Sequence, residues 1–213
     1  MNIKKIIAAL IVSTAGSGTA LAEPPTPPQQ LPSVFDHSVI DGNALSGARG
    51  QIGVNMAAGS NNAQTNAAAI GLATDRGMGI GHVSLSQRIQ NSEASGNSVA
   101  NAQIGGSAFS NSSGLIGINQ ASGAGNAQAN IISIGIGLNA KAAADAELAQ
   151  TVTGVGASDS KNSNSNAPKM ATIEGNAFNG SRGVVQVNQS AGVGNATGNS
   201  FAMRVETGAG GLQ

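Results

Sequence analysis

Residues 40–70 of this chain read IDGNALSGARGQIGVNMAAGSNNAQTNAAAI. The same pattern returns at residues 104–134 as IGGSAFSNSSGLIGINQASGAGNAQANIISI, and at residues 173–203 as IEGNAFNGSRGVVQVNQSAGVGNATGNSFAM. The copies are offset by 64 and then by 69 residues, and they align without a gap. Internal repetition at such a period is typical of proteins in which one supersecondary unit stacks on the next.

Each copy contains two stretches with a period of two residues, which is the spacing of a β-strand. In the first stretch, apolar side chains alternate with others. A glycine between the stretches supplies the backbone freedom that a turn requires, and we expect this turn at residues 57–61 and their equivalents. The candidate core residues are Ile52, Val54, Ile116, Ile118, Val185 and Val187, and the candidate turn glycines are Gly59, Gly123 and Gly192.

Amide side chains recur at equivalent positions of the three copies. If these positions superpose at the spacing of paired strands, the amides can form hydrogen-bonded ladders along the stack. We therefore interpret them as ladder and self-assembly residues. A plainer interpretation treats the same residues as turn formers of a monomeric β-solenoid. The candidates are Asn55, Asn62, Gln64, Asn66, Asn119, Gln120, Asn126, Gln128, Asn130, Asn188, Gln189, Asn195 and Asn199.

The composition argues against an ordinary enzyme domain. Gly, Ala, Ser and Asn together supply 113 of 213 residues, whereas the chain has four Phe and no Trp or Tyr. Large aromatic groups are therefore too few for a typical compact core. Charged residues make up 9%, with ten of each sign, so no basic surface for nucleic acid is present. There is also no cysteine, so stability has to come from backbone pairing rather than from disulfides.

These features predict an all-β fold, a stacked β-solenoid or cross-β repeat with three imperfect strand-turn-strand units and flexible linkers. In the first unit we expect strands near residues 40–45, 50–56, 62–70 and 82–90. The alanine-rich residues 139–149 could instead form a turn or two of helix, residues 161–168 a solvated loop, and the third unit lacks its last strand. The predicted segments are repeat unit 1 with its spacer (38–103), repeat unit 2 with its spacer (104–172) and repeat unit 3 (173–213).

The beginning of the chain has the features of an export signal. Lys4 and Lys5 precede an apolar run, and Ala20-Leu21-Ala22 has the form of a cleavage site, so we expect residues 1–22 to be a signal peptide. The apolar run is too short to cross a bilayer, and no later run reaches that length. Residues 23–37 form a proline-rich tether, because proline cannot donate to a sheet. We therefore expect a protein secreted through the periplasm to the cell surface.

Sites for chemistry are not evident in this sequence. His37 and His82, without any cysteine, do not form a zinc motif, and Gly77-Met-Gly79-Ile-Gly81 lacks the lysine of a phosphate-binding loop. Asn126 and Asn195 stand where a calcium β-roll would need aspartate. We predict no enzymatic activity, no cofactor, no metal and no nucleic-acid partner.

The repeats resemble the Fap-type functional amyloid subunits of bacterial biofilms. The imperfect repeats of that family carry a G-x-N-x-A-x-G-x-x-N-x-Q-x-N pattern, which appears here in residues 53–66 and 117–130. In the third copy Gln186 replaces the first Gly, Ser190 the Ala and Thr197 the Gln. The resemblance implies a secreted structural subunit that polymerises into amyloid fibres of the biofilm matrix. Its implied partners are copies of itself, other fibre subunits and an outer-membrane export pore.

Two alternatives stay open at this stage. Major subunits of the family usually carry a C-x-x-C pair, and this chain has no cysteine. The resemblance therefore leaves a nucleating or minor subunit, or a divergent major one, as the alternatives. A monomeric secreted β-solenoid that acts as an adhesin is the competing hypothesis.

Overall fold

The chain forms three stacked layers of strands. A computed structural model describes residues 34–75, 77–90, 93–94, 98–138, 140–153, 156–157 and 167–208. The first layer holds β1 (Val34–Ile40), β2 (Arg49–Ala58), β3 (Ala63–Thr74) and β4 (Met78–Gln90). The second holds β6 (Ser98–Ile104), β7 (Ser113–Ser122), β8 (Ala127–Leu138) and β9 (Lys141–Thr153). The third holds β11 (Lys169–Ile173), β12 (Arg182–Ala191) and β13 (Ala196–Thr207).

Equivalent strands of successive layers pair in parallel and in register. The strand orders are β1-β6-β11, β2-β7-β12, β3-β8-β13 and β4-β9, and the short β5 (Glu93–Ala94) and β10 (Gly156–Ala157) also pair. Asn55 lies beside Asn119, and Asn119 beside Asn188, so the register reproduces the repeat offsets of the sequence. The prediction of an all-β, stacked repeat is confirmed.

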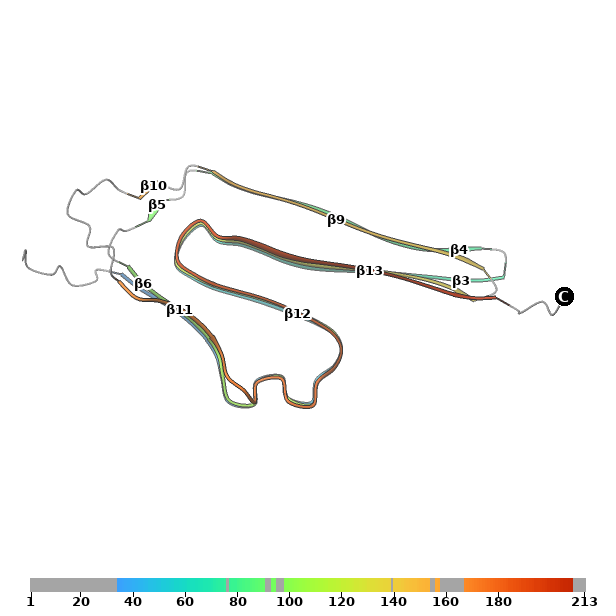
Figure 1. Cartoon of the computed structure of the whole chain (residues 1–213), viewed down its shortest axis with the longest axis horizontal. Helices are drawn as coiled ribbons and strands as arrows, with labels where there is room; N and C mark the ends of the chain where they lie inside the picture. Colours follow the sequence, from blue (N-terminus) through green and yellow to red (C-terminus); the bar gives the residue numbers. More distant parts are fainter. Residues whose placement is uncertain are drawn as a thin grey trace, which may run out of the picture.

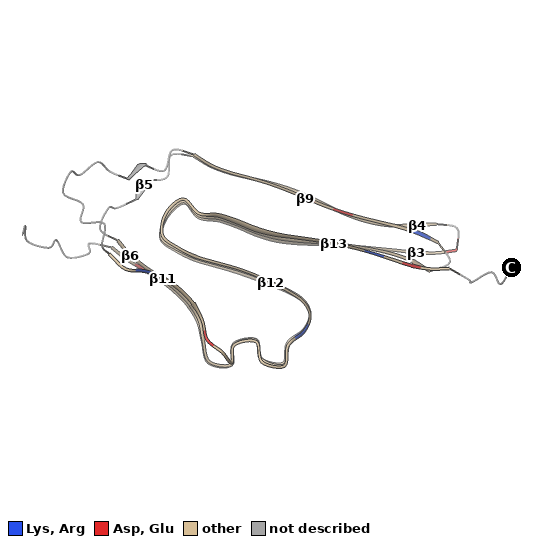
Figure 2. Cartoon of the chain, in the orientation of Figure 1, with Lys and Arg blue, Asp and Glu red and all other residues tan. Residues whose placement is uncertain are grey.

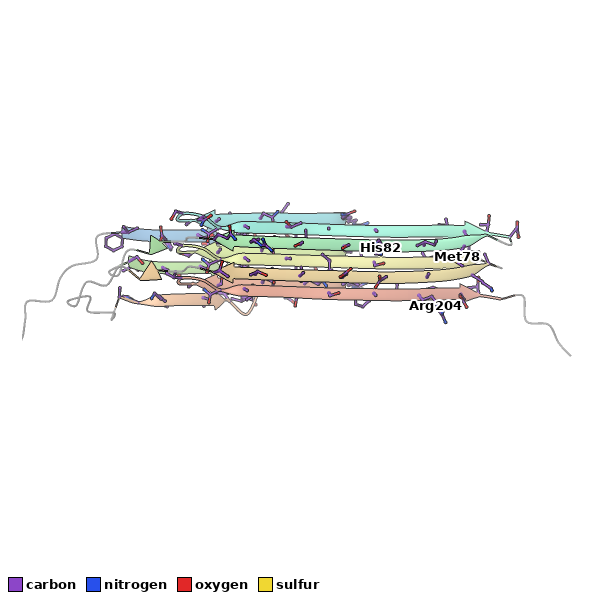
Figure 3. The ribbon with its side chains drawn as sticks, turned by 90° about the horizontal axis from the view of Figure 1, so that it is seen from above. Met78, His82 and Arg204 are labelled. Atoms are coloured by element: carbon purple, nitrogen blue, oxygen red, sulfur yellow. The ribbon has the colours of Figure 1, made fainter. Side chains whose placement is uncertain are left out.

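Each layer follows a winding path in which successive strands belong to different sheets (Figure 1). The sheet β3-β8-β13 lies between β2-β7-β12 on one side and β4-β9 on the other, and the equivalent strands of the layers superpose closely. Viewed from the perpendicular direction, the strands are stacked one above another (Figure 3). The structure therefore has two end faces, the first layer and the third, with the second layer enclosed between them.

The apolar core lies where the loops after β1, β6 and β11 meet β2-β7-β12. Ile116 and Ile118 are fully buried there, next to Ile104 and Phe109. The ring of Phe109 stacks on that of Phe178 with a centroid distance of 5.2 Å. Of the other predicted core residues, Ile52, Val54 and Val187 pack against this cluster, whereas Val185 is 38% exposed.

Two expectations about local structure are wrong. Residues 40–45 are not a strand: β1 ends at Ile40 and a turn follows at 42–47, where Gly42 and Gly47 have positive φ angles of 68° and 70°. The helix expected within the alanine-rich residues 139–149 is also wrong, because residues 141–149 belong to β9, which pairs with β4 along its whole length. Pairing with a neighbouring strand outweighs the helix propensity of alanine here.

Other expectations fall largely or entirely outside the described residues. These are the signal peptide, the proline-rich tether up to Ser33 and most of the linkers between the layers, including residues 161–166. Among the residues that the structure describes, no helix is long and apolar enough to span a membrane.

Candidate functional site

Two columns of asparagine face each other between β2-β7-β12 and β3-β8-β13. In the first column, Asn119 Nδ2 donates to Asn55 Oδ1 at 2.9 Å, and Asn188 Nδ2 donates to Asn119 Oδ1 at 3.0 Å. In the second, the Nδ2 atoms of Asn130 and Asn199 donate to the Oδ1 atoms of Asn66 and Asn130, each at 2.9 Å. Both columns run through all three layers.

The two columns are also bonded to each other within each layer. Asn66 Nδ2 donates to Asn55 Oδ1 at 2.8 Å, and Asn130 Nδ2 donates to Asn119 Oδ1 at 3.0 Å. Asn119 Nδ2 also donates to the Thr65 carbonyl at 2.8 Å. Asn119 is fully buried and Asn130 is 1% exposed, so these amides replace the apolar contacts of an ordinary sheet interface with a satisfied polar network.

A third asparagine column lies in the arc between the two strands. The amide Nδ2 of Asn126 donates to Asn62 Oδ1 at 2.9 Å, and that of Asn195 donates to Asn126 Oδ1 at 2.7 Å. The backbone N–H groups of Asn126 and Asn195 donate to the same two oxygens. Because Asn62 Nδ2 donates to the Gly123 carbonyl, the column also holds successive arcs together.

Glutamine side chains form two shorter columns. Gln64 Nε2 donates to Gln128 Oε1 at 2.7 Å, and Gln128 Nε2 donates to Ser190 Oγ at 2.9 Å. In the third copy, Thr197 stands in place of this glutamine, and Ser190 accepts the hydrogen bond from Gln128 instead. The second column lies on β7 and β12, where Gln189 Nε2 donates to Gln120 Oε1 at 2.8 Å. Gln120 Nε2 donates to the carbonyls of Ser38 and Gln103, which bonds this column to the sheet β1-β6-β11.

Sequence reasoning missed one more amide pair. Gln150 Nε2 donates to Gln87 Oε1 at 2.8 Å between β9 and β4, and Gln87 Nε2 reaches Thr65 Oγ1 at 3.0 Å in β3. The signal was present, because Gln87 and Gln150 occupy equivalent positions at an offset of 63 residues. This pair bonds the sheet β4-β9 to the sheet β3-β8-β13.

The turn glycines adopt a conformation that other residues rarely take. Gly59, Gly123 and Gly192 have φ angles of 100°, 108° and 121°. A Cβ at Gly59 would overlap the carbonyl oxygen of Gly123, and one at Gly123 would overlap that of Gly192. Gly59 and Gly123 therefore need glycine both for their φ angles and for the close stacking of the arcs, whereas Gly192 needs it for its φ angle.

Charged and metal-binding groups play no part in the amide columns. Residues 51–74 and 114–140 contain no charged side chain, and Figure 2 shows none along β12 and β13 near their connecting arc. His37 is exposed, and its Nε2 lies 3.1 Å from Asn101 Nδ2. His82 Nδ1 lies 3.3 Å from Asp145 Oδ2. Within the described residues, no three His, Asp or Glu side chains could jointly hold a metal.

The amide columns lie within the part of the chain that matches a known protein family. The profile of the functional amyloid protein FapB/FapC family matches residues 20–206, which is most of the chain. The chain belongs to this family. No solved structure matches it.

Membership of the FapB/FapC family is consistent with the stacked amides. The family consists of functional amyloid proteins, so a structural role is supported rather than an enzymatic one. Parallel, in-register strands with amide ladders are the architecture of cross-β assemblies. Within this FapB/FapC chain, the three repeats already form three successive layers of such an assembly.

Proposed function

We propose that the chain is a secreted structural subunit, major or nucleating, that polymerises into the amyloid fibres of a biofilm matrix. New chains add to the end faces of the three-layer stack, with the first layer of one chain on the third layer of another. The amide columns named above are the self-assembly residues. Export uses the signal peptide expected at residues 1–22 and an outer-membrane pore, and the fibres lie at the cell surface.

The polarity of the asparagine columns is the observation that carries this proposal. In all three columns, the Nδ2 of each layer donates to the Oδ1 of the layer before it. Within the described part of the chain, Asn55 Nδ2 has no acceptor, and Asn188 Oδ1 accepts only from Asn199 in its own layer. In the column of Asn55, Asn119 and Asn188, the first layer therefore offers a donor where the third layer offers an acceptor.

Exposed strand edges give the same ends a strong tendency to pair. The backbone of a strand at the end of a sheet presents unpaired N–H and C=O groups unless another strand covers them. In the part of the chain that the structure describes, β1, β2, β3 and β4 end one face and β11, β12 and β13 end the other. The two faces share one register, because Gly50, Gly114 and Gly183 align across the layers.

Asn55→Asp tests the proposal without disturbing the bonds within one chain. An aspartate keeps the oxygen that accepts from Asn66 and Asn119, but it places a carboxylate where the neighbouring chain presents Asn188 Oδ1. We expect a folded chain whose fibrillation at neutral pH is slowed about tenfold or more and recovers near pH 3, where the carboxyl is protonated. Thioflavin fluorescence and electron microscopy measure this, with Asn61→Asp as the matched control on an exposed arc residue.

The parent chain decides between a polymer and a monomeric adhesin. Mature protein should form fibres with a 4.7–4.8 Å reflection at a rate that rises with concentration. A chain that stays monomeric at every concentration, or an Asn55→Asp variant that fibrillates like the parent, would overturn the proposal.

A further inference from the structure

The sheet β4-β9, which we call the fourth sheet, has one strand fewer than the other three long sheets. It contains β4 and β9 only, whereas each of the other long sheets has a strand from every layer. Because β9 belongs to the second layer, β4 covers one of its edges, and the described residues place no strand against the other. This second edge lies on the side of the third layer, next to β13, as the contacts below show.

The residues of β13 differ from their equivalents at the place where a fourth strand would pack. Arg204 is aligned with Gly135, and Gly135 with Gly71. A Cβ at Gly71 would overlap the backbone of Ile80 in β4, and one at Gly135 would overlap the carbonyl oxygen of Ala143 in β9. The fourth sheet thus approaches the third closely enough to require glycine, and the third layer has an arginine at the equivalent position.

Side chains of β13 also reach the open edge of β9. Glu206 Oε1 accepts from the Ala142 N–H at 2.9 Å, and Ser200 Oγ donates to the Ala146 carbonyl at 3.0 Å. Arg204 Nε lies 3.8 Å from Glu206 Oε1, so the arginine and the glutamate are neighbours at this edge. Figure 3 shows Arg204 on the strand at one end of the stack. Charged side chains and capped backbone groups are common means of closing an edge strand.

We propose that Arg204 and Glu206 close the edge of β9 to strand addition, so that chains join only through the β11, β12 and β13 edges. The role in fibres rests on the proposed function, but the closure is a property of a single chain. In a stack of chains, the fourth sheet is then interrupted once per molecule. The β4 strand of the next chain lies two strand spacings, about 9.5 Å, from β9.

A peptide with the sequence of β4, residues 78–90, is the probe that tests this closure. The double variant Arg204→Gly/Glu206→Gly copies the bulk of the second layer, which has Gly135 and Gly137 at these positions. It should bind the fluorescein-labelled peptide about tenfold or more tightly than the parent chain. Arg204→Gln/Glu206→Gln is the matched control, because it removes the charges but keeps the bulk and an acceptor for Ala142. It should bind as weakly as the parent.

Each outcome decides the matter. The proposal that side-chain bulk closes the edge would be overturned if the parent and the glycine variant bind equally or if neither binds. Tight binding by the glutamine variant would also overturn it. If the double glycine variant does not fold, the single Arg204→Gly change gives the same comparison, with protection of the β9 amides from hydrogen exchange as a second readout. Peptide binding is measured on the full chain whether or not it polymerises, so failure of the proposed function would be recognised separately.

Discussion

Two interfaces bring sheets together in this protein, and they do so by opposite means. Between β2-β7-β12 and β3-β8-β13, asparagine side chains interlock across the interface; we call this the amide interface. Between β3-β8-β13 and β4-β9, glycines allow direct approach of the two backbones; we call this the glycine interface. A chain almost without aromatic residues can thus join sheets by filling the gap with hydrogen-bonded amides or by removing the side chains altogether.

The largest effect is expected at the glycine interface. In Gly135→Ala, the new Cβ meets the carbonyl oxygen of Ala143, and backbone cannot move aside as a flexible side chain can. We expect a loss of about 3 kcal/mol in the free energy of unfolding, measured by denaturant titration. Gly175→Ala is the control, because a Cβ there meets no atom within 4 Å. Equal stability of the two variants would contradict direct backbone contact at this interface.

The next effect is expected at the centre of the amide interface. Asn119→Ala removes bonds to Asn55, Asn130 and Asn188 and leaves buried polar atoms without partners. We expect a loss of about 2 kcal/mol in the same measurement. Asn55→Ala, at the end of the column, should cost about half as much, because only one layer lies against it. If both changes cost the same, the column does not act as a continuous ladder.

A smaller loss of stability is expected when the amide pair Gln87–Gln150 at the glycine interface is broken. Gln150→Ala removes hydrogen bonds from Gln150 to Gln87 and to the Thr197 carbonyl. It should cost about 1 kcal/mol, because Gln150 is only partly buried and water can replace its bonds. In hydrogen exchange, the loss should appear in β4 and β9 while the amide interface keeps its protection. Loss of protection in β7 instead would show that the two interfaces are not separate.

The smallest effect concerns a carboxyl group outside both interfaces. Desolvation by burial raises the pKa of Asp36 in β1. A raised pKa in the folded state means that stability is greatest below the pKa of the unfolded chain and falls as pH rises through the folded value. Asp36→Asn should therefore stabilise the chain at pH 7 by less than about 1 kcal/mol and flatten this dependence. An unchanged pH profile of denaturation would contradict this assignment.

The sequence predicts which residues lie next to each other along the stack, but not which residues of two facing sheets meet. The ungapped offsets place Asn55, Asn119 and Asn188 in one column, and the register of the strands has this alignment. Repetition contains no information on which sheets face each other, so the bonding of Asn66 to Asn55 came only from the structure.

The prediction of local structure is wrong in two places. A strand is expected near residues 40–45, but Gly42 and Gly47 have positive φ angles and lie in a turn there. The alanines of β9 suggested helix, yet small side chains also suit a sheet that lies close to another, and the pairing with β4 decides between them. The sequence also shows glycine at 71 and 135 and arginine at 204, but only the packing of the fourth sheet gives that difference a meaning.

Mass per unit length of the fibres, from scanning transmission electron microscopy, tests the account most directly. Three layers per chain at about 4.8 Å each predict one chain for every 14 Å or so of fibre length. One chain for every 4.8 Å or so would mean that each molecule lies flat in a single layer, and would contradict the stacking of the three repeats on which the account depends.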